Sequence, residues 1–312
     1  NNRRRGDVGK LRNRPQPKKT ALAILKLNSK TNSPLLSSPN QSSVLELGLR
    51  HGTMAEWLAI DDDLPIYHAH KLQQIGFHRG EVIAVLPESE LAQKEFGRLL
   101  LTHLTQYHGQ RYTTNGHDLS TRDGILKWPL PATDLQSCCL WIQEDICLLQ
   151  ALNNEYVLTA ASVCSPSNWR LSEKIGKALG AIHDPVPGYE DTLHTRTNRL
   201  LHKLSKDKVI IRYNWSVQAG NELCWRPELY PAQEPAEPYW RVERQTLRRL
   251  PETGAIVFGI RIFLESFTKL ESRQPGFTAT LREIIERLPE EQRRYKGLDS
   301  LLARPEFGAL KS

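Results

Sequence analysis

The chain has 312 residues, of which 39% are hydrophobic and 25% charged, so it has enough apolar side chains to form a core. Its net charge of +7 arises in the first 20 residues, which hold eight basic side chains and one acid; subtracting these from the totals of 42 and 35 leaves 34 of each sign. Because the rest of the chain is neutral and has no basic stripe interleaved with aromatic residues, these features argue against nucleic-acid binding. No window approaches 18 uncharged apolar residues, which argues against a membrane-spanning helix.

Residues 1–45 are rich in Asn, Ser, Pro, Lys and Arg, which predicts a disordered basic leader. The arginine-rich start also resembles an organelle-targeting segment, and this alternative remains open. Five cysteines form no C-x-x-C pair and no zinc-site spacing, and no secretory signal precedes them. We therefore expect free thiols and a cytoplasmic protein.

Residues 46–137 form a region of mainly helical pattern. Its clearest segment has Leu91, Phe96, Leu99, Leu100 and Leu104 at spacings of one to five residues, which predicts an amphipathic helix over about residues 88–108.

The pattern becomes extended near residue 138. Two short β-rich runs, "CCLWIQEDICLLQ" and "NEYVLTAASVCSP", flank the hairpin-like "ALNN", and they place Cys138 and Cys139 in a strand. A helical block follows, and then come three more extended runs, "KVIIRYNWSVQ", "YWRVERQTLRRLP" and "AIVFGIRIFLES". Thr253 and Gly254 supply a turn between the last two.

Two strands, a group of helices and three more strands are the connectivity of a PAS domain. We therefore predict an α+β protein whose core, residues 138–268, is a PAS-like five-stranded antiparallel sheet with inserted helices. Helical extensions precede this core and follow it over residues 269–312. Domains of this topology bind haem, flavin or small ligands between the sheet and the inserted helices, so a binding site is expected there.

The stretch "SPSNWRLSEKIGKALGAIHDPVPGYED" begins the helical block. Ser167 and Asn168 are suited to cap a helix running from about Trp169 to Ala181. The spacing of Ile175, Leu179 and Ile182 gives this helix an apolar stripe, which His183 extends. The prolines at 185 and 187 then stop the helix. A histidine in this position is either a buried side chain bonded to a carbonyl or an axial ligand of haem iron.

Three long motifs now occur in fixed order: "SPSNWRLSEKIGKALGAIHDPVPGY", "VIIRYNWSV" and "WRVERQTLRRLPETGAIVFGIRIF". Together with "MAEWLAID" and "YKGL", they make residues 50–305 resemble the haem-dependent oxidative N-demethylases, alpha-subunit-like. The resemblance implies a PAS-fold haem monooxygenase that removes a methyl group from a small secondary amine and releases formaldehyde. It also implies O2 as oxidant and electrons from NAD(P)H through a separate flavin or iron–sulfur reductase.

The resemblance also directs attention to particular side chains. His183 is the expected iron ligand, and His194 in the next helical segment is the alternative. Arginines suit the haem propionates because their fork holds a carboxylate bidentately, and a structural ion pair with a nearby acid is the alternative for each of them. Trp169 and Trp215 either line the pocket or fill the core. The expected cofactor-binding residues are His183, Arg212, Arg241, Arg244 and Trp169, and the expected catalytic residues are Glu243, Asn214 and Trp215.

Strand alternation sorts these side chains into rows. Arg241, Glu243 and Gln245 share one face of their strand, opposite Arg244, and Arg212 shares a face with Asn214. Which row faces the inserted helices does not follow from alternation. Two functions other than catalysis also fit the same sequence: a haem- or ligand-binding module without turnover, and a partner subunit that has lost haem.

Overall fold

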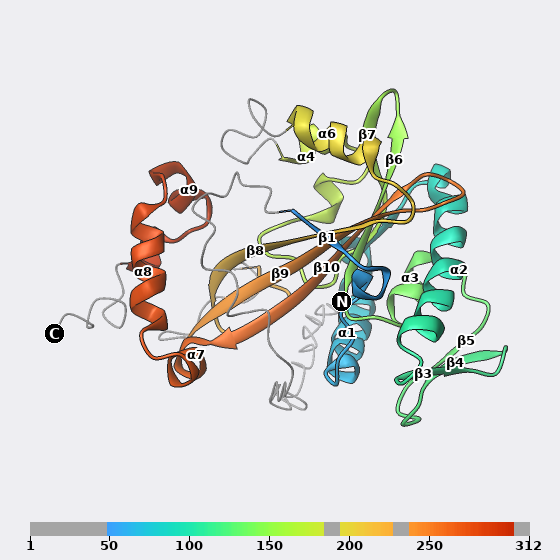
Figure 1. Ribbon diagram of the computed structural model, residues 1–312, viewed down its shortest axis with the longest axis horizontal. Coiled ribbons are helices and arrows are strands. Elements are labelled where there is room, and N and C mark those ends of the chain that lie inside the picture. Colours follow the sequence, from blue (N-terminus) through green and yellow to red (C-terminus); the bar gives the residue numbers. More distant parts are fainter. Residues whose placement is uncertain (1–48, 184–193, 227–236, 303–312) are drawn as a thin grey trace, which may run out of the picture.

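A seven-stranded antiparallel sheet forms the centre of the molecule (Figure 1). The computed structural model describes residues 49–183, 194–226 and 237–302. The strand order is β1-β8-β9-β10-β6-β7-β2. The strands are β1 (Arg50–Gly52), β2 (Ile83–Val85), β6 (Asp145–Leu152), β7 (Glu155–Ser162), β8 (Val209–Ala219), β9 (Pro238–Arg249) and β10 (Ile256–Ser266).

The five long strands, β6 to β10, lie where the sequence predicted extended runs. Asn153 and Asn154 join β6 to β7 with φ of 52° and 66°, the left-handed conformations that a two-residue hairpin turn needs. Gly254, with φ of 73°, serves the turn between β9 and β10. The sheet has seven strands rather than the five predicted, because β1 pairs with β8 and β2 pairs with β7 at its two edges.

Helices surround this sheet, and a small sheet of β3 (Tyr112–Thr114), β4 (Asp118–Thr121) and β5 (Lys127–Pro129) lies beside them. The α-helices are α1 (Leu64–Val82), α2 (Glu90–Tyr107), α3 (Leu135–Cys139), α4 (Leu179–His183), α6 (His194–Lys203), α7 (Phe267–Arg273), α8 (Phe277–Arg287), α9 (Glu290–Tyr295) and α10 (Asp299–Leu302). Three 3-10 turns complete the list: η2 (Met54–Trp57), η3 (Pro87–Ser89) and η4 (Leu171–Glu173). Helix α2 confirms the amphipathic helix predicted over residues 88–108.

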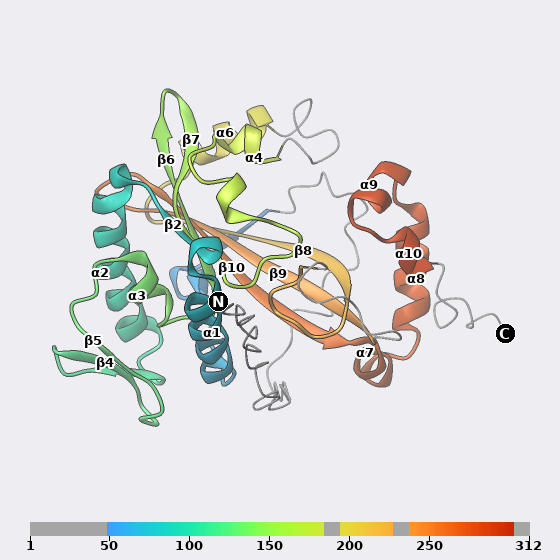
Figure 2. The ribbon, with the colours of Figure 1, turned by 180° about the vertical axis from the view of Figure 1, so that it is seen from behind.

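The two faces of the sheet are covered by different parts of the chain. Face 1, which carries Val209, Val257 and Trp215, packs against η2, α2 and α3 at one end and against α7 and α8 at the other. Figure 2 shows these two groups of helices at opposite ends of the long strands. Face 2, which carries Ile210 and Phe258, is covered at one end by η4, α4 and α6, the segment inserted between β7 and β8. Farther along β10 the same face, at Ile262 and Leu264, packs against Tyr67 of α1. The insertion therefore defines face 2 as the expected location of a ligand.

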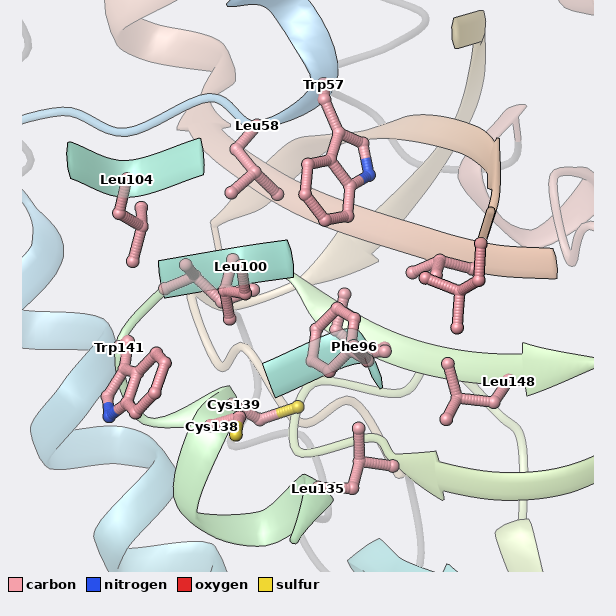
Figure 3. Packing of buried hydrophobic residues seen from close by; sticks show 14 of the residues in the cluster. Trp57, Leu58, Phe96, Leu100, Leu104, Leu135, Cys138, Cys139, Trp141 and Leu148 are labelled. Carbon is pink, nitrogen blue, oxygen red and sulfur yellow. The ribbon is translucent and has the colours of Figure 1, made fainter. Parts of the chain in front are cut away.

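Close packing on face 1 centres on α2 (Figure 3). Phe96 and Leu100 are fully buried, and the Trp57 ring meets the Phe96 ring edge-on with centroids 6.3 Å apart. Cys138 and Cys139 also belong to this cluster, because α3, capped by Asp134, contains them. Their predicted placement in a strand is therefore wrong.

The tightest approach lies at Gly97 in α2. A Cβ there would lie 2.9 Å from both the Ala132 carbonyl oxygen and the Cys138 sulfur. We expect Gly97→Ala to lower the free energy of unfolding by about 1–3 kcal/mol, because the backbone carbonyl cannot move aside cheaply. Gly76 in α1 has nothing within 4 Å, so Gly76→Ala is expected to stabilise the protein by about 0.5–1 kcal/mol. Urea unfolding would measure the change in free energy of unfolding in each variant. Equal changes at the two positions would contradict the close approach at Gly97.

The segment predicted as one helix from Trp169 to Ala181 is broken. It contains η4 and, after an irregular stretch, α4. Gly176, with φ of 77°, donates its N–H to the Leu158 carbonyl, and Leu158 donates back to the Lys177 carbonyl. These bonds lay residues 176–178 along β7 and end the helical path. Asn168 is not a cap either, because it has φ of 53° and its N–H donates to the Trp225 carbonyl.

Other predictions have mixed outcomes. The five cysteines are free, as expected. All five are also buried, which raises the pKa of each thiol. None of the helices in the described ranges combines the length and apolar composition needed to cross a bilayer. The predicted leader over residues 1–45 and the Pro185–Pro187 stop lie outside the described residues.

Candidate functional site

Two polar rows meet on face 2, the face covered by the inserted segment. Strands β8 and β9 pair so that Arg212 lies opposite Gln245 and Asn214 lies opposite Glu243. Directly paired residues on neighbouring strands project to the same side of the sheet. Strand alternation did not show which row faces the inserted helices. In the structure these two rows lie on face 2, together with Ile210 and Leu247.

The Glu243 carboxylate is the centre of a hydrogen-bond network. Its Oε2 accepts from the Asn214 amide at 3.2 Å and from the Gln245 amide at 2.9 Å. The Arg241 Nε lies 3.7 Å from its Oε1. The Glu243 side chain is 17% exposed. The Glu243 carboxylate is thus mostly buried, is held by two neutral amides and lies beside one guanidinium.

Lys296, which follows α9, completes the network and was not among the predicted site residues. Its ammonium donates to Asn214 Oδ1 at 3.2 Å and to the Trp215 carbonyl at 2.5 Å, and it lies 4.5 Å from the centre of the Trp215 ring. Burial, assisted by the nearby Arg212, lowers the Lys296 pKa to about 8, and Glu243 opposes this shift. The motif "YKGL" was the only sequence signal for this lysine, because 82 residues separate it from Asn214.

The lowered pKa of Lys296 predicts a pH dependence of stability. Between about pH 8 and the ordinary lysine pKa of 10.5, the unfolded chain binds this proton and the folded chain does not. The difference in free energy of unfolding between the parent and Lys296→Met should therefore shift in favour of the parent as pH rises through this range. This shift should disappear as pH falls through 8. Urea unfolding at pH 7, 8.5 and 10 would measure it. Lys208→Met, at an exposed position, is the control. If the free energies of unfolding of the two variants follow the same course with pH, the lowered pKa of Lys296 is contradicted.

Arg241 occupies the same row as Glu243 but lies deeper. Its side chain is fully buried and donates to the carbonyls of Leu223 at 3.0 Å and Ser165 at 2.6 Å, and to Gln218 Oε1 at 3.2 Å. Burial lowers the pKa of this guanidinium. Arg241 therefore ties the loop after β7 and the loop after β8 to the sheet.

Arg244 and Trp215, two other predicted site residues, lie on face 1. The Arg244 guanidinium donates to the carbonyls of Glu56 and Trp57 in η2. Trp215 is 3% exposed, stacks on Trp240 with ring centroids 4.8 Å apart, and packs beneath α8. The structure brings together Arg212, Asn214 and Glu243 of the predicted set and separates Arg244 and the Trp215 ring from them.

The apolar part of face 2 adjoins the polar network. Ile210 precedes Arg212 on β8 and Leu247 follows Gln245 on β9, in each case two residues along the same face. Trp169, Leu179 and Ile182 pack on this apolar part from the inserted segment. Helix α4 ends at His183 and α6 begins at His194, but the side chains of both histidines lie outside the described residues.

Face 2 is therefore amphipathic, with an apolar area beneath α4 and α6 beside a charged network on β8 and β9. In the ranges that the structure describes, no three His, Cys, Asp or Glu side chains gather to hold a metal ion by themselves. A family model described as haem-dependent oxidative N-demethylase, alpha subunit-like, matches residues 48–303, which include every residue of this network. The chain belongs to that family.

Proposed function

We propose that this chain is the haem-binding subunit of a monooxygenase that demethylates a small secondary amine. The balanced reaction is R–NH–CH3 + O2 + 2 e− + 2 H+ → R–NH2 + HCHO + H2O. The C–H bond of the methyl group is oxidised, one oxygen atom leaves in formaldehyde and the other in water. A separate flavin or iron–sulfur reductase supplies the two electrons from NAD(P)H. The alpha-subunit designation of the family supports a partner of this kind.

The strand order supports a PAS-like core over residues 138–268. The five long strands follow the order β8-β9-β10-β6-β7, and the helical segment is inserted between β7 and β8. In this architecture the insertion and the sheet enclose the ligand, which corresponds here to face 2. β1, β2 and the flanking helices are additions outside this five-stranded unit.

The residues on face 2 fit haem. The apolar cluster that includes Trp169, Leu179 and Phe258 matches the apolar macrocycle, and the nearby Arg212 is suited to a propionate. His183 ends α4 and directly follows Ile182, which packs in this cluster, so we assign it as the iron ligand. When bound, haem supplies the iron that activates O2.

The Glu243 network is the observation that carries the substrate assignment. A secondary amine is protonated at neutral pH, and the mostly buried Glu243 carboxylate, although it already lies 3.7 Å from Arg241 Nε, is the group that we assign to bind such a cation. The Asn214 and Gln245 amides fix the orientation of this carboxylate. Once the amine has transferred its proton to a base, its lone pair and methyl group are free to react, and the network holds two groups able to take a proton, Glu243 and Lys296. Arg241, Arg244 and the Trp215 ring then have structural roles.

The test is reconstitution with haem followed by an assay for formaldehyde. The protein should show a Soret band after haem supplementation, and it should release formaldehyde from at least one amine in a panel of N-methylated secondary amines when O2 and a reductase are supplied. If the protein shows a haem band but releases no formaldehyde from any amine, its function is that of a haem-binding module and not of an enzyme. Absence of a haem band would reject the proposal and leave a partner subunit without haem.

A further inference from the structure

A second group of buried polar side chains lies on face 1, opposite the Glu243 network. Arg248 of β9 lies with its guanidinium carbon 4.3 Å from the centre of the Trp57 ring. The His103 ring of α2 contacts the same indole, with centroids 4.8 Å apart, and lies 5.4 Å from the ring of His108. Figure 3 shows Trp57 above Phe96, with the indole nitrogen turned away from Leu58. We call Trp57, His103, His108 and Arg248 the face 1 cluster.

Six buried nitrogens of the face 1 cluster have no hydrogen-bond partner within the described part of the chain. Both ring nitrogens of His103, Nε2 of His108, Nε1 of Trp57, and Nε and Nη1 of Arg248 are buried without a hydrogen bond. Arg248 is 7% exposed and His103 is 2% exposed. More than nine in ten buried polar groups in folded proteins have a hydrogen-bond partner. This many unpaired nitrogens in one place therefore indicate that a partner of the cluster is missing.

The chemistry of these atoms defines what the missing partner is. Arginine and the indole nitrogen are donors only, and each neutral histidine adds one more N–H. No carboxylate in the described ranges pairs with Arg248, whose pKa burial lowers to about 10. Burial lowers the pKa of His103 to about 3 and that of His108 to about 4, and neighbouring cations, His108 and Arg248 for the first and Arg111 for the second, act in the same direction. Each neutral histidine also has one acceptor nitrogen, but the donors of the cluster outnumber these acceptors. A partner that accepts several hydrogen bonds and carries negative charge would therefore satisfy most of the cluster.

We propose that the face 1 cluster binds a compact oxyanion, of the phosphate or carboxylate class. A single oxyanion offers acceptors to several of these donors and offsets the buried charge of Arg248. The Tyr107 ring lies 4.8 Å from that of His103 and is 37% exposed, so the cluster lies directly beneath the protein surface. The cluster lies on the face opposite Glu243, so this site does not depend on the proposed demethylase function.

Isothermal titration of the parent protein with sulfate, phosphate and acetate at pH 7 tests the proposal, with sodium chloride at matched ionic strength as the reference. We expect at least one of the three anions to bind with Kd of about 1 mM or tighter. Preference for sulfate and phosphate over acetate would assign a phosphate-type ligand, and the reverse preference a carboxylate. Absence of binding by all three anions up to about tenfold that concentration would overturn the site.

Variants distinguish this site from general attraction of anions. Arg248→Met should weaken binding about tenfold or more, because it removes the charged donor and leaves an apolar side chain on Trp57. His103→Phe keeps a ring in place and removes two nitrogens, and it serves if Arg248→Met does not fold. Arg98→Gln is the matched control, since it removes one cation from the exposed side of α2, where the Arg98 side chain is 62% exposed. Equal losses in Arg98→Gln and Arg248→Met would contradict a specific site.

Discussion

Replacing Glu243 by glutamine is expected to lower kcat/KM for amine demethylation by about 10–100-fold and to leave the haem spectrum unchanged. Glutamine keeps the size of the side chain but removes the charge that attracts the substrate ammonium. A hydrogen bond to a charged group contributes about 1.5–3 kcal/mol, which corresponds to this range. Formaldehyde release measured at several amine concentrations would give kcat and KM separately. A rise in KM alone assigns Glu243 to binding, and a parallel fall in kcat assigns it to proton transfer as well.

Two further variants sharpen this experiment. Glu243→Asp keeps the charge but withdraws it from the Asn214 and Gln245 amides, so its kcat/KM should lie between those of the parent and Glu243→Gln. Glu155→Gln, at the exposed start of β7, removes a carboxylate from a strand that β10 and β6 separate from β9, and it should have no effect. Normal kcat/KM in Glu243→Gln would remove this carboxylate from the reaction and with it the observation on which the substrate assignment depends.

The long strands could be predicted because their signals are local. Strands β8, β9 and β10 are runs of 11 or 12 residues rich in β-branched and aromatic side chains, and turn residues bound them. β1 and β2 have three residues each and form only because an edge of the large sheet is available to them. A segment that short has no periodicity to detect.

The failures of prediction come from long-range contacts. The spacing of Ile175, Leu179 and Ile182 is that of a helix, but Gly176 and Lys177 exchange backbone hydrogen bonds with Leu158 of β7 instead. Tertiary pairing overrides local helical preference in such cases.

The candidate site shows the same division. Alternation correctly placed Asn214 with Arg212 and Glu243 with Gln245, because it depends only on the pleat of each strand. It did not reveal that both rows face the inserted segment, since that depends on which apolar clusters form on each side. It also did not reveal Lys296, which reaches Asn214 only because the C-terminal helices pack on the end of the sheet.

The largest expected effect is that of His183→Ala on haem binding. Removing the iron ligand should abolish or shift the Soret band and weaken haem binding by about tenfold or more, since each 1.4 kcal/mol of lost ligation is a factor of ten. Absorption spectra of the parent and the variant after identical haem supplementation would measure it. Haem should also raise the melting temperature of the parent more than that of the variant, because a ligand stabilises the folded state according to its affinity.

His194→Ala is the matched control, because α6 begins at His194 and packs on the same face through Leu201. If His183 ligates the iron, His194→Ala keeps the parental band. If instead His194→Ala loses the band and His183→Ala keeps it, the ligand comes from the second helix of the insertion, and haem still lies on face 2. Retention of an unchanged band in both variants would mean that neither of these two histidines ligates the iron. His202, the other histidine of α6, whose ring lies 5.1 Å from that of Tyr156 in the apolar cluster of face 2, would then be the next residue to replace. An unchanged band in His202→Ala as well would remove haem from this face and the Glu243 network from its place beside the reacting methyl group.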